Sequence, residues 1–146
     1  MMVRGKNQVE TFLPTETIVT ERLWIIPLSG EELGWYVGDA QSLAERFRLK
    51  IGESPAPFFQ AIVGRQCQKV FADPGHWLWL TFWLIVDRET HRIVGSIDYK
   101  NIPDDTGTVE IGYGIDKCQE NKGYATAAVQ AFTANAFTKA AITRVI

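Results

Sequence analysis

Residues 108–116 alternate strictly between two kinds of side chain. One set is apolar or aromatic, and the other is acidic or glycine: Val109, Ile111, Tyr113 and Ile115 against Glu110, Gly112, Gly114 and Asp116. A period of two residues predicts a β-strand with two different faces. The two glycines leave one face almost bare, which marks either a bulge or a place where a ligand approaches the backbone.

A polar turn over Lys117–Lys122 ends in Gly123, and a helical pattern follows. Small and apolar residues recur at helical spacing on one stripe: Ala125, Ala128, Val129, Phe132 and Ala136. This spacing predicts a helix to about Ala140 that packs through that stripe. The amides of the loop and of the first helical turn would point at one spot. Such a helix start, with Lys122 beside it, suits a phosphate or pyrophosphate.

The remaining apolar runs predict further strands and helices. The expected strands are Ile18–Leu28, Trp77–Asp87, Arg92–Lys100 and Thr143–Ile146. The second of these is rich in tryptophan, and we expect it to be central and buried on both faces. The expected helices are Gly30–Val37, capped by Ser29, then Ala40–Leu49 and Phe58–Phe71. The pattern indicates one α/β domain over residues 16–146, preceded by a flexible extension over residues 1–15.

Composition narrows the class of protein. The 146 residues are 46% hydrophobic and 22% charged, as in an ordinary globular domain. A net charge of −2 gives no reason to expect nucleic acid as a partner. The apolar runs are too short for a membrane span, and the N-terminus lacks a signal-peptide core, so we expect a cytoplasmic protein. Cys67 and Cys118 have no metal-like spacing and are expected to be free thiols, so no metal site is predicted.

The loop before the predicted helix resembles a known acyl-CoA site. It lacks the GxxxxGK[ST] pattern of a P-loop, but Glu120-Asn121-Lys122-Gly123-Tyr124-Ala125 resembles the Arg/Gln-x-x-Gly-x-Gly/Ala motif of the GNAT superfamily of N-acetyltransferases. Gly123 and Ala125 match the motif, whereas Glu120 stands where Arg or Gln is usual. An acidic side chain is unfavourable beside a pyrophosphate. Gln119 could take its place, or the backbone amides could bind alone.

Other segments resemble the GNAT branch that includes the ribosomal-protein N-terminal acetyltransferases. They are Thr20-Glu21-Arg22-Leu23, Ile93-Val94-Gly95-Ser96-Ile97 and Val109-Glu110-Ile111-Gly112-Tyr113. The resemblance implies a mixed, mostly antiparallel central sheet flanked by helices. It also implies that the chain stops before the family's final helix and strands. We therefore expect either a truncated chain or another subunit that covers an open sheet edge.

The resemblance also implies a function. Acetyl-CoA would bind, and its acetyl group would pass to a primary amine by direct attack in a ternary complex. The acceptor would be a protein N-terminus or a small amine, and because dimers are common in this branch, a homodimer is expected. The residues that the resemblance assigns to acetyl-CoA are Tyr113, Gly114, Ile115, Glu120, Asn121, Lys122, Gly123, Tyr124 and Ala125.

Two carboxylates are candidates for the chemistry of the acceptor amine. Glu110 is the expected general base, because it stands in an otherwise apolar strand and matches a Glu common in this branch. Burial there would favour it as a base near neutral pH. The alternative is a structural Glu110 that pairs with Lys100 or Arg92. Asp98, on the neighbouring strand, is expected to bind the substrate amine, or else to face solvent.

Two other functions fit the same features. Glu120 and the early end of the chain also suit a non-catalytic acyl-CoA-binding or regulatory module. An open sheet edge would suit an assembly subunit that has no ligand. Turnover separates the enzyme from the module, and affinity for acetyl-CoA separates both from the subunit.

Overall fold

The computed structural model describes residues 9–139 and 141–146. Its main sheet has five strands in the order β1-β2-β3-β4-β6, each antiparallel to its neighbours. These strands are β1 (Ile18–Val19), β2 (Leu23–Pro27), β3 (Phe82–Asp87), β4 (Arg92–Tyr99) and β6 (Ile111–Ile115). A second, parallel pair joins β5 (Thr108–Val109) to β7 (Arg144–Val145). The α/β class with a mostly antiparallel sheet is confirmed.

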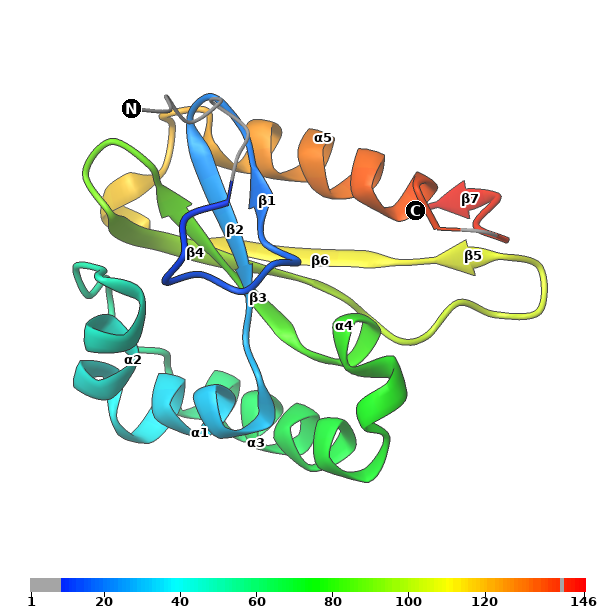
Figure 1. Cartoon of the computed structure of the whole chain (residues 1–146), viewed down its shortest axis with the longest axis horizontal. Helices are drawn as coiled ribbons and strands as arrows, with labels where there is room; N and C mark the ends of the chain where they lie inside the picture. Colours follow the sequence, from blue (N-terminus) through cyan, green and yellow to red (C-terminus); the bar gives the residue numbers. More distant parts are fainter. Residues whose placement is uncertain (1–8, 140) are drawn as a thin grey trace.

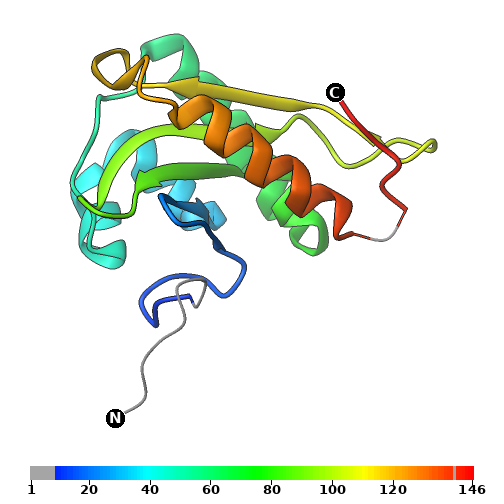
Figure 2. The same ribbon diagram turned by 90° about the horizontal axis from the view of Figure 1, so that it is seen from above.

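Helices cover the two faces of the sheet (Figure 1). One face carries α1 (Gly30–Gly38), α2 (Ala40–Phe47) and α3 (Pro57–Ala72). The single turn α4 (Trp77–Leu80) has residues packed on both faces. The other face carries α5 (Tyr124–Phe137), which Figure 2 shows running along the strands. Short 3-10 turns lie at Pro74–His76 and Lys117–Gln119. No helix in the described residues is long and apolar enough to cross a bilayer.

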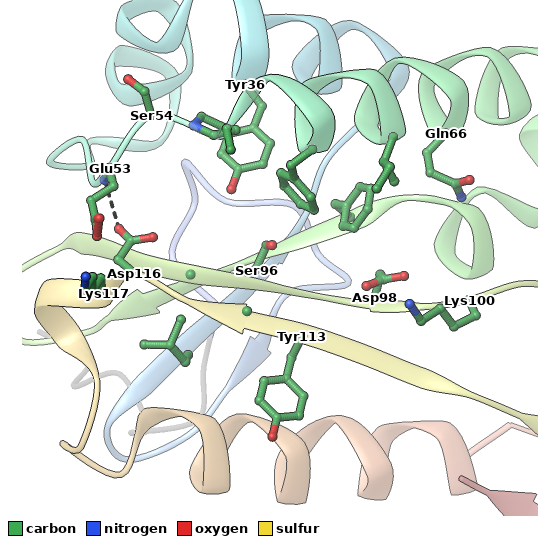
Figure 3. Close-up of a pocket in the computed structure, with 18 residues that line it drawn as sticks. Tyr36, Glu53, Ser54, Gln66, Ser96, Asp98, Lys100, Tyr113, Asp116 and Lys117 are labelled. Carbon is green, nitrogen blue, oxygen red and sulfur yellow. Dashed lines mark hydrogen bonds between the residues drawn. The ribbon is translucent and has the colours of Figure 1, made fainter.

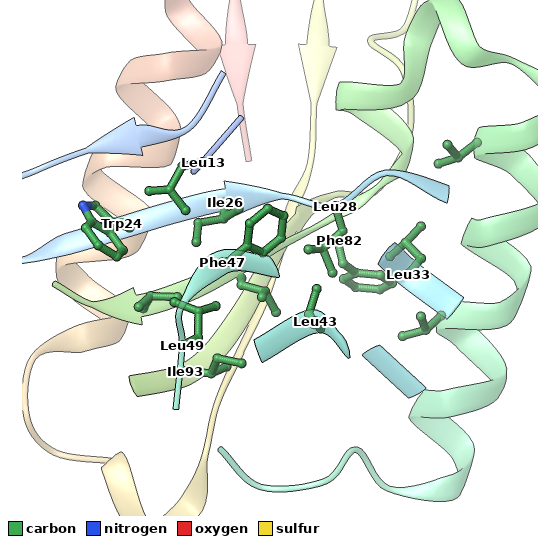
Figure 4. Close-up of a cluster of buried hydrophobic side chains, with 14 of the residues drawn as sticks. Leu13, Trp24, Ile26, Leu28, Leu33, Leu43, Phe47, Leu49, Phe82 and Ile93 are labelled. Atoms are coloured by element: carbon green, nitrogen blue, oxygen red, sulfur yellow. The ribbon is translucent and has the colours of Figure 1, made fainter. Parts of the chain in front are cut away.

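Each face of the sheet has its own apolar core. The core under α1, α2 and α3 includes Trp24, Ile26, Phe82, Leu33, Leu43 and Phe47 (Figure 4). The core under α5 includes Leu23, Ile25, Trp83, Ile97, Tyr99, Ala128, Phe132 and Ala136. Strand β3 contributes alternate residues to both cores, which confirms that it is central and buried on both faces. Burial of two apolar faces supplies the main stabilisation of the fold.

Helix α1 follows the sequence signals closely. The Ser29 side chain accepts a hydrogen bond from the Glu32 amide, and the Glu32 side chain accepts one from the Ser29 amide. This capping box satisfies two amides at the helix start. Helix α2 ends two residues before the predicted Leu49, because Arg48 takes a left-handed conformation, with φ of 57°.

The predicted strand Trp77–Asp87 is wrong over its first part. Residues Trp77–Leu80 form a helical turn, and the strand begins at Phe82. Four large apolar residues in succession do not distinguish a strand from a helical turn. In the turn, Trp79 packs on Tyr99 with ring centroids 4.7 Å apart, and Leu80 joins the core under α3.

Two other predicted strands are interrupted. The expected strand Ile18–Leu28 is a tight hairpin, because the Thr20 hydroxyl accepts a hydrogen bond from the Leu23 amide (2.8 Å) and turns the chain. The expected strand Thr108–Asp116 is divided at Glu110 into β5 and β6.

Within the predicted N-terminal extension, residues 1–8 lie outside the described part of the chain, and Leu13 is buried.

The C-terminal strand lies beside the start of the divided strand. The Ile146 amide donates to the Val109 carbonyl, and the Ile111 amide donates to the Ile146 carbonyl, both at 3.0 Å. Strand β7 therefore pairs with this segment as far as Ile111. Beyond that point, no described strand lies along the outer edge of β6. The open sheet edge that the resemblance implies stays a prediction.

Two phenylalanines on α5 provide a test of the core. Phe132 is fully buried and stacks on Tyr99 with ring centroids 4.0 Å apart, whereas Phe137 is 51% exposed. We expect Phe132→Ala to lower the free energy of unfolding by about 3–5 kcal/mol, because it leaves a cavity between helix and sheet. The exposed control Phe137→Ala should change it by about 0.5 kcal/mol. Urea unfolding followed by circular dichroism measures both, and equal losses would contradict the assigned helix face.

Candidate functional site

The outer edge of β6 presents unpaired backbone groups. The Ile111 amide points outward to Ile146, and the Asp116 amide points inward to the Val94 carbonyl (2.8 Å). Because amides alternate between the two edges of a strand, those of Tyr113 and Ile115 point outward, like that of Ile111. No described strand receives them. This edge can therefore pair with a ligand that carries peptide-like groups.

The start of α5 presents a second set of amides. Gly123 has a φ of 82°, a conformation that favours glycine, and the Ala127 amide is bonded to the Gly123 carbonyl (3.1 Å). The amides of residues 124–126 precede that first helical bond, so they have no carbonyl of their own helix to bind. They border a hollow of about 370 Å³ that is lined by Tyr113, Ile115, Gln119, Glu120, Asn121, Gly123, Tyr124, Ala125 and Thr126.

Arg22 holds the loop before α5 in place. Its guanidinium donates a hydrogen bond to the Lys122 carbonyl and lies 4.3 Å from the centre of the Tyr124 ring. The Tyr124 hydroxyl in turn donates to the carboxylate of Asp87, at the end of β3. Burial alone would raise the pKa of Asp87, but this bond and the backbone amides of the following turn keep it below its ordinary value. The β1–β2 turn and β3 therefore both fix the position of the loop.

A larger cavity of about 570 Å³ lies between strands β4 and β6 and helices α1 and α3 (Figure 3). Its polar lining consists of Tyr36, Glu53, Ser54, Gln66, Ser96, Asp98, Lys100, Asp116 and Lys117. It shares Tyr113 and Ile115 with the smaller hollow, so the two spaces meet at β6. A Cβ added to Gly114, which also lines the cavity, would meet nothing within 4 Å. The missing side chain therefore leaves the backbone of β6 open to a ligand.

The two carboxylates predicted for the acceptor differ in position. Asp98 is half-buried and lines the large cavity. Burial raises the pKa of Asp98 to about 6, and of the nearby charges Lys100 lowers this pKa while Glu110 raises it. Glu110 is exposed, beside the break between β5 and β6, and is absent from the cavity lining. The burial that the prediction assumed for Glu110 is therefore not found. Within the described part of the chain, it forms no ion pair with Lys100 or Arg92.

The structure brings together most of the residues predicted to bind acetyl-CoA. Seven of them line the smaller hollow, Gly114 lines only the larger one, and Lys122 lines neither. The Lys122 ammonium donates to the Gln119 side chain (3.2 Å), so both belong to the loop structure. Tyr124 is only 7% exposed, so its ring supports the hollow more than it reaches into it. The roles of these residues stay predictions.

Sequence reasoning missed the opposite wall of the large cavity. Tyr36 on α1 and Gln66 on α3 face β4 across it (Figure 3). Burial raises the pKa of Tyr36 to about 12, so its hydroxyl stays neutral. No motif marks these residues, because helices α1 and α3 are placed by packing. The alternation of Ser96, Asp98 and Lys100 along one strand could have identified the wall on β4.

Comparison with known proteins identifies the family. The family model described as acetyltransferase (GNAT) domain matches residues 22–146. The chain therefore belongs to the GNAT family of acetyltransferase domains, as the loop and strand motifs predict.

Known relatives agree with this assignment. An uncharacterized N-acetyltransferase, YjdG of Bacillus subtilis (strain 168), is 32% identical over 63 residues, which are 43% of this chain and 38% of that protein. The match thus spans well under half of that relative.

Ribosomal-protein-S5-alanine acetyltransferase from Vibrio fischeri has a similar structure, with a TM-score of 0.57 and 19% identity. The match covers 88% of this chain and 71% of that chain. The microcin C7 self-immunity acetyltransferase MccE, solved with acetyl-CoA and AMP, has a TM-score of 0.58, 16% identity and coverage of 93% and 74%. At these identities the two structures show a shared fold.

The contact between Arg22 and the loop can be tested by hydrogen exchange. We expect Arg22→Ala to release the Lys122 carbonyl and the Tyr124 ring, so the amides of residues 122–126 should exchange at least about tenfold faster, about 1.4 kcal/mol of lost local protection. Hydrogen–deuterium exchange with mass spectrometry measures this. The matched control is Arg65→Ala, at an exposed arginine on α3. Unchanged exchange in Arg22→Ala would show that the loop is held by other contacts.

Proposed function

We propose that this chain binds acetyl-CoA and transfers its acetyl group to a primary amine. One observation carries the proposal: outward-pointing amides on β6 and free amides at the start of α5 border two hollows that meet at Tyr113 and Ile115. One hollow suits the donor and the other suits the acceptor. The family membership of residues 22–146 supports the same chemistry.

The donor side fits the chemical groups of acetyl-CoA. The pantetheine arm contains two amide groups, and the free edge at Tyr113 and Ile115 offers the matching backbone donors and acceptors. The pyrophosphate would bind to the first amides of α5, where the helix dipole favours an anion. Gln119 borders the same hollow and supplies a neutral polar group beside the exposed Glu120. Backbone amides thus replace the Arg or Gln side chain that the family motif usually provides.

The acceptor would enter the cavity of about 570 Å³. Its amine must lose a proton before its lone pair attacks the thioester carbonyl carbon, after which the C–S bond breaks and coenzyme A leaves as a thiol. Glu110 and Asp98 are the candidate carboxylates for that proton. The acceptor is a protein N-terminus or a small amine. The ribosomal-protein acetyltransferase among the similar structures supports the first. A cytoplasmic location and a homodimer stay predictions.

A non-catalytic acyl-CoA-binding module is the second candidate. It rests on the departure from the family motif at Glu120, an exposed carboxylate in the lining of the hollow where the enzymes usually have Arg or Gln. The two functions predict the same ligand and differ only in chemistry.

Calorimetry and product analysis test the proposal together. We expect this chain to bind acetyl-CoA with a Kd in the micromolar range, about −8 kcal/mol. We also expect it to acetylate at least one member of a panel of amines. Suitable amines are peptides with N-terminal Ala or Ser and aliphatic diamines, with products detected by mass spectrometry. Binding without any product would favour the module, and absence of binding by the folded chain would contradict both functions.

A glycine substitution tests the donor loop. Gly123→Asp places a side chain at a φ of 82°, with its Cβ 3.1 Å from the Arg22 guanidinium, and puts a carboxylate where the pyrophosphate would bind. We expect acetyl-CoA affinity to fall more than about 100-fold, about 2.7 kcal/mol. The control is Gly64→Asp on α3, where an added Cβ has open space. Equal affinity in the two variants would contradict the assigned phosphate site.

A further inference from the structure

Strand β7 closes part of the edge of β6 and so limits where a donor can lie. The Ile146 amide and carbonyl bond to Val109 and Ile111, one on each side of Glu110. A ligand cannot pair with the backbone at that point, because the chain itself is already paired there. Among residues 9–139 and 141–146, no strand pairs with the edge between Ile111 and the loop before α5, and this is the part considered open.

A donor that follows this open edge has a defined end point. The phosphates of the donor would lie at the start of α5. Its pantetheine arm would run along β6 from Ile115 towards Ile111, a stretch of strand about 13 Å long at the rise of a β-strand. The thioester would then lie near Gly112 and Tyr113. Gly112 is the register partner of Asp98 on β4. Asp98 is thus the cavity carboxylate that lies beside the expected end of the donor.

The Asp98 carboxylate lies close to the backbone at Gly112. A Cβ built on Gly112 would lie 3.1 Å from Oδ1 of Asp98. The end of the Lys100 side chain lies over the same point, with Cε 2.6 Å from that position. Glu110 does not line the cavity.

We propose that the Asp98 carboxylate, which lines the cavity beside Gly112, accepts the proton of the acceptor ammonium. This assignment rests on the proposed acetyl transfer. The ammonium gives one proton to Asp98, and the neutral amine forms the new C–N bond to the thioester carbon. The C–S bond breaks with its electrons on sulfur, and the thiolate takes the second proton from the nitrogen. Asp98 then returns its proton to solvent.

The charges around Asp98 suit this role. Burial is the largest of the effects that bring the pKa of Asp98 to about 6. The charge of Lys100 lowers this pKa, and the charge of Glu110 raises it. Across the cavity, Tyr36 on α1 is neutral at physiological pH and Gln66 on α3 is uncharged. The other charged groups of the lining are Glu53, Asp116 and Lys117. Asp98 is therefore ionised at neutral pH and binds a proton more tightly than an ordinary Asp.

The sign of the pH dependence follows from this. Asp98 accepts a proton only when it is ionised, so kcat/KM should rise with pH through about 6 and be lost below it. Replacing Glu110 by Gln removes a negative charge that raises the pKa of Asp98. The acidic limb of the profile should therefore move to lower pH in Glu110→Gln.

Two isosteric variants test the assignment. Asp98→Asn and Glu110→Gln would be compared with the unmodified chain for acetyl-CoA affinity and for kcat and kcat/KM between pH 5 and 9, with the amine panel described above. Asp98→Asn should lower kcat about 10²- to 10⁴-fold and leave acetyl-CoA affinity nearly unchanged. Glu110→Gln should shift the acidic limb and lower turnover above pH 7.5 far less than Asp98→Asn does.

The outcomes separate this assignment from the proposed function. If the unmodified chain acetylates an amine while Asp98→Asn retains half of its turnover, the role of Asp98 is overturned and the acetyl transfer stands. A large loss confined to Glu110→Gln would return the base to Glu110. If the unmodified chain binds acetyl-CoA and forms no product, the proposed transfer fails, and the role of Asp98 fails with it.

Discussion

The candidate site depends on one constraint: in the described part of the chain, β6 is hydrogen-bonded along its length to β4 on one side and only as far as Ile111 on the other. Backbone amides are strong donors, and those left without a protein partner must bind water or a ligand. Within the described residues, no strand receives the outward amides of Tyr113 and Ile115, so they are open to water or a ligand.

The same strand also connects the two faces of the sheet. Its outward-facing backbone borders the hollow at α5, while the bare position at Gly114 borders the cavity under α1 and α3. A glycine at this position lets a ligand contact the backbone from above as well as from the edge. A donor on one side and an amine on the other can thus meet across a single strand, which is what direct transfer requires.

The two hollows differ in the polar groups that they offer to a ligand. At α5 the charge partners are backbone amides, and the Arg22 side chain is used to hold the loop, because it contacts the Lys122 carbonyl and the Tyr124 ring. In the large cavity the polar groups are side chains, and partial burial changes the proton affinity of Asp98. An anion site made of amides, as proposed at α5, would resist changes of pH, whereas the proposed acceptor cavity would respond to pH through Asp98.

The sequence by itself determined the features that depend on local chemistry. The capping box of Ser29 and Glu32, the glycine before α5 and the alternation along β4 and β6 were readable because each signal lies within a few residues. Tertiary structure alone decided the helical turn at Trp77–Leu80, the exposure of Glu110 and the cavity wall of Tyr36 and Gln66. These depend on which distant segments pack together, and a local pattern of apolar residues does not specify its partner. Packing across the sheet therefore separates the two carboxylates, because Asp98 lines the cavity whereas Glu110 is exposed outside it.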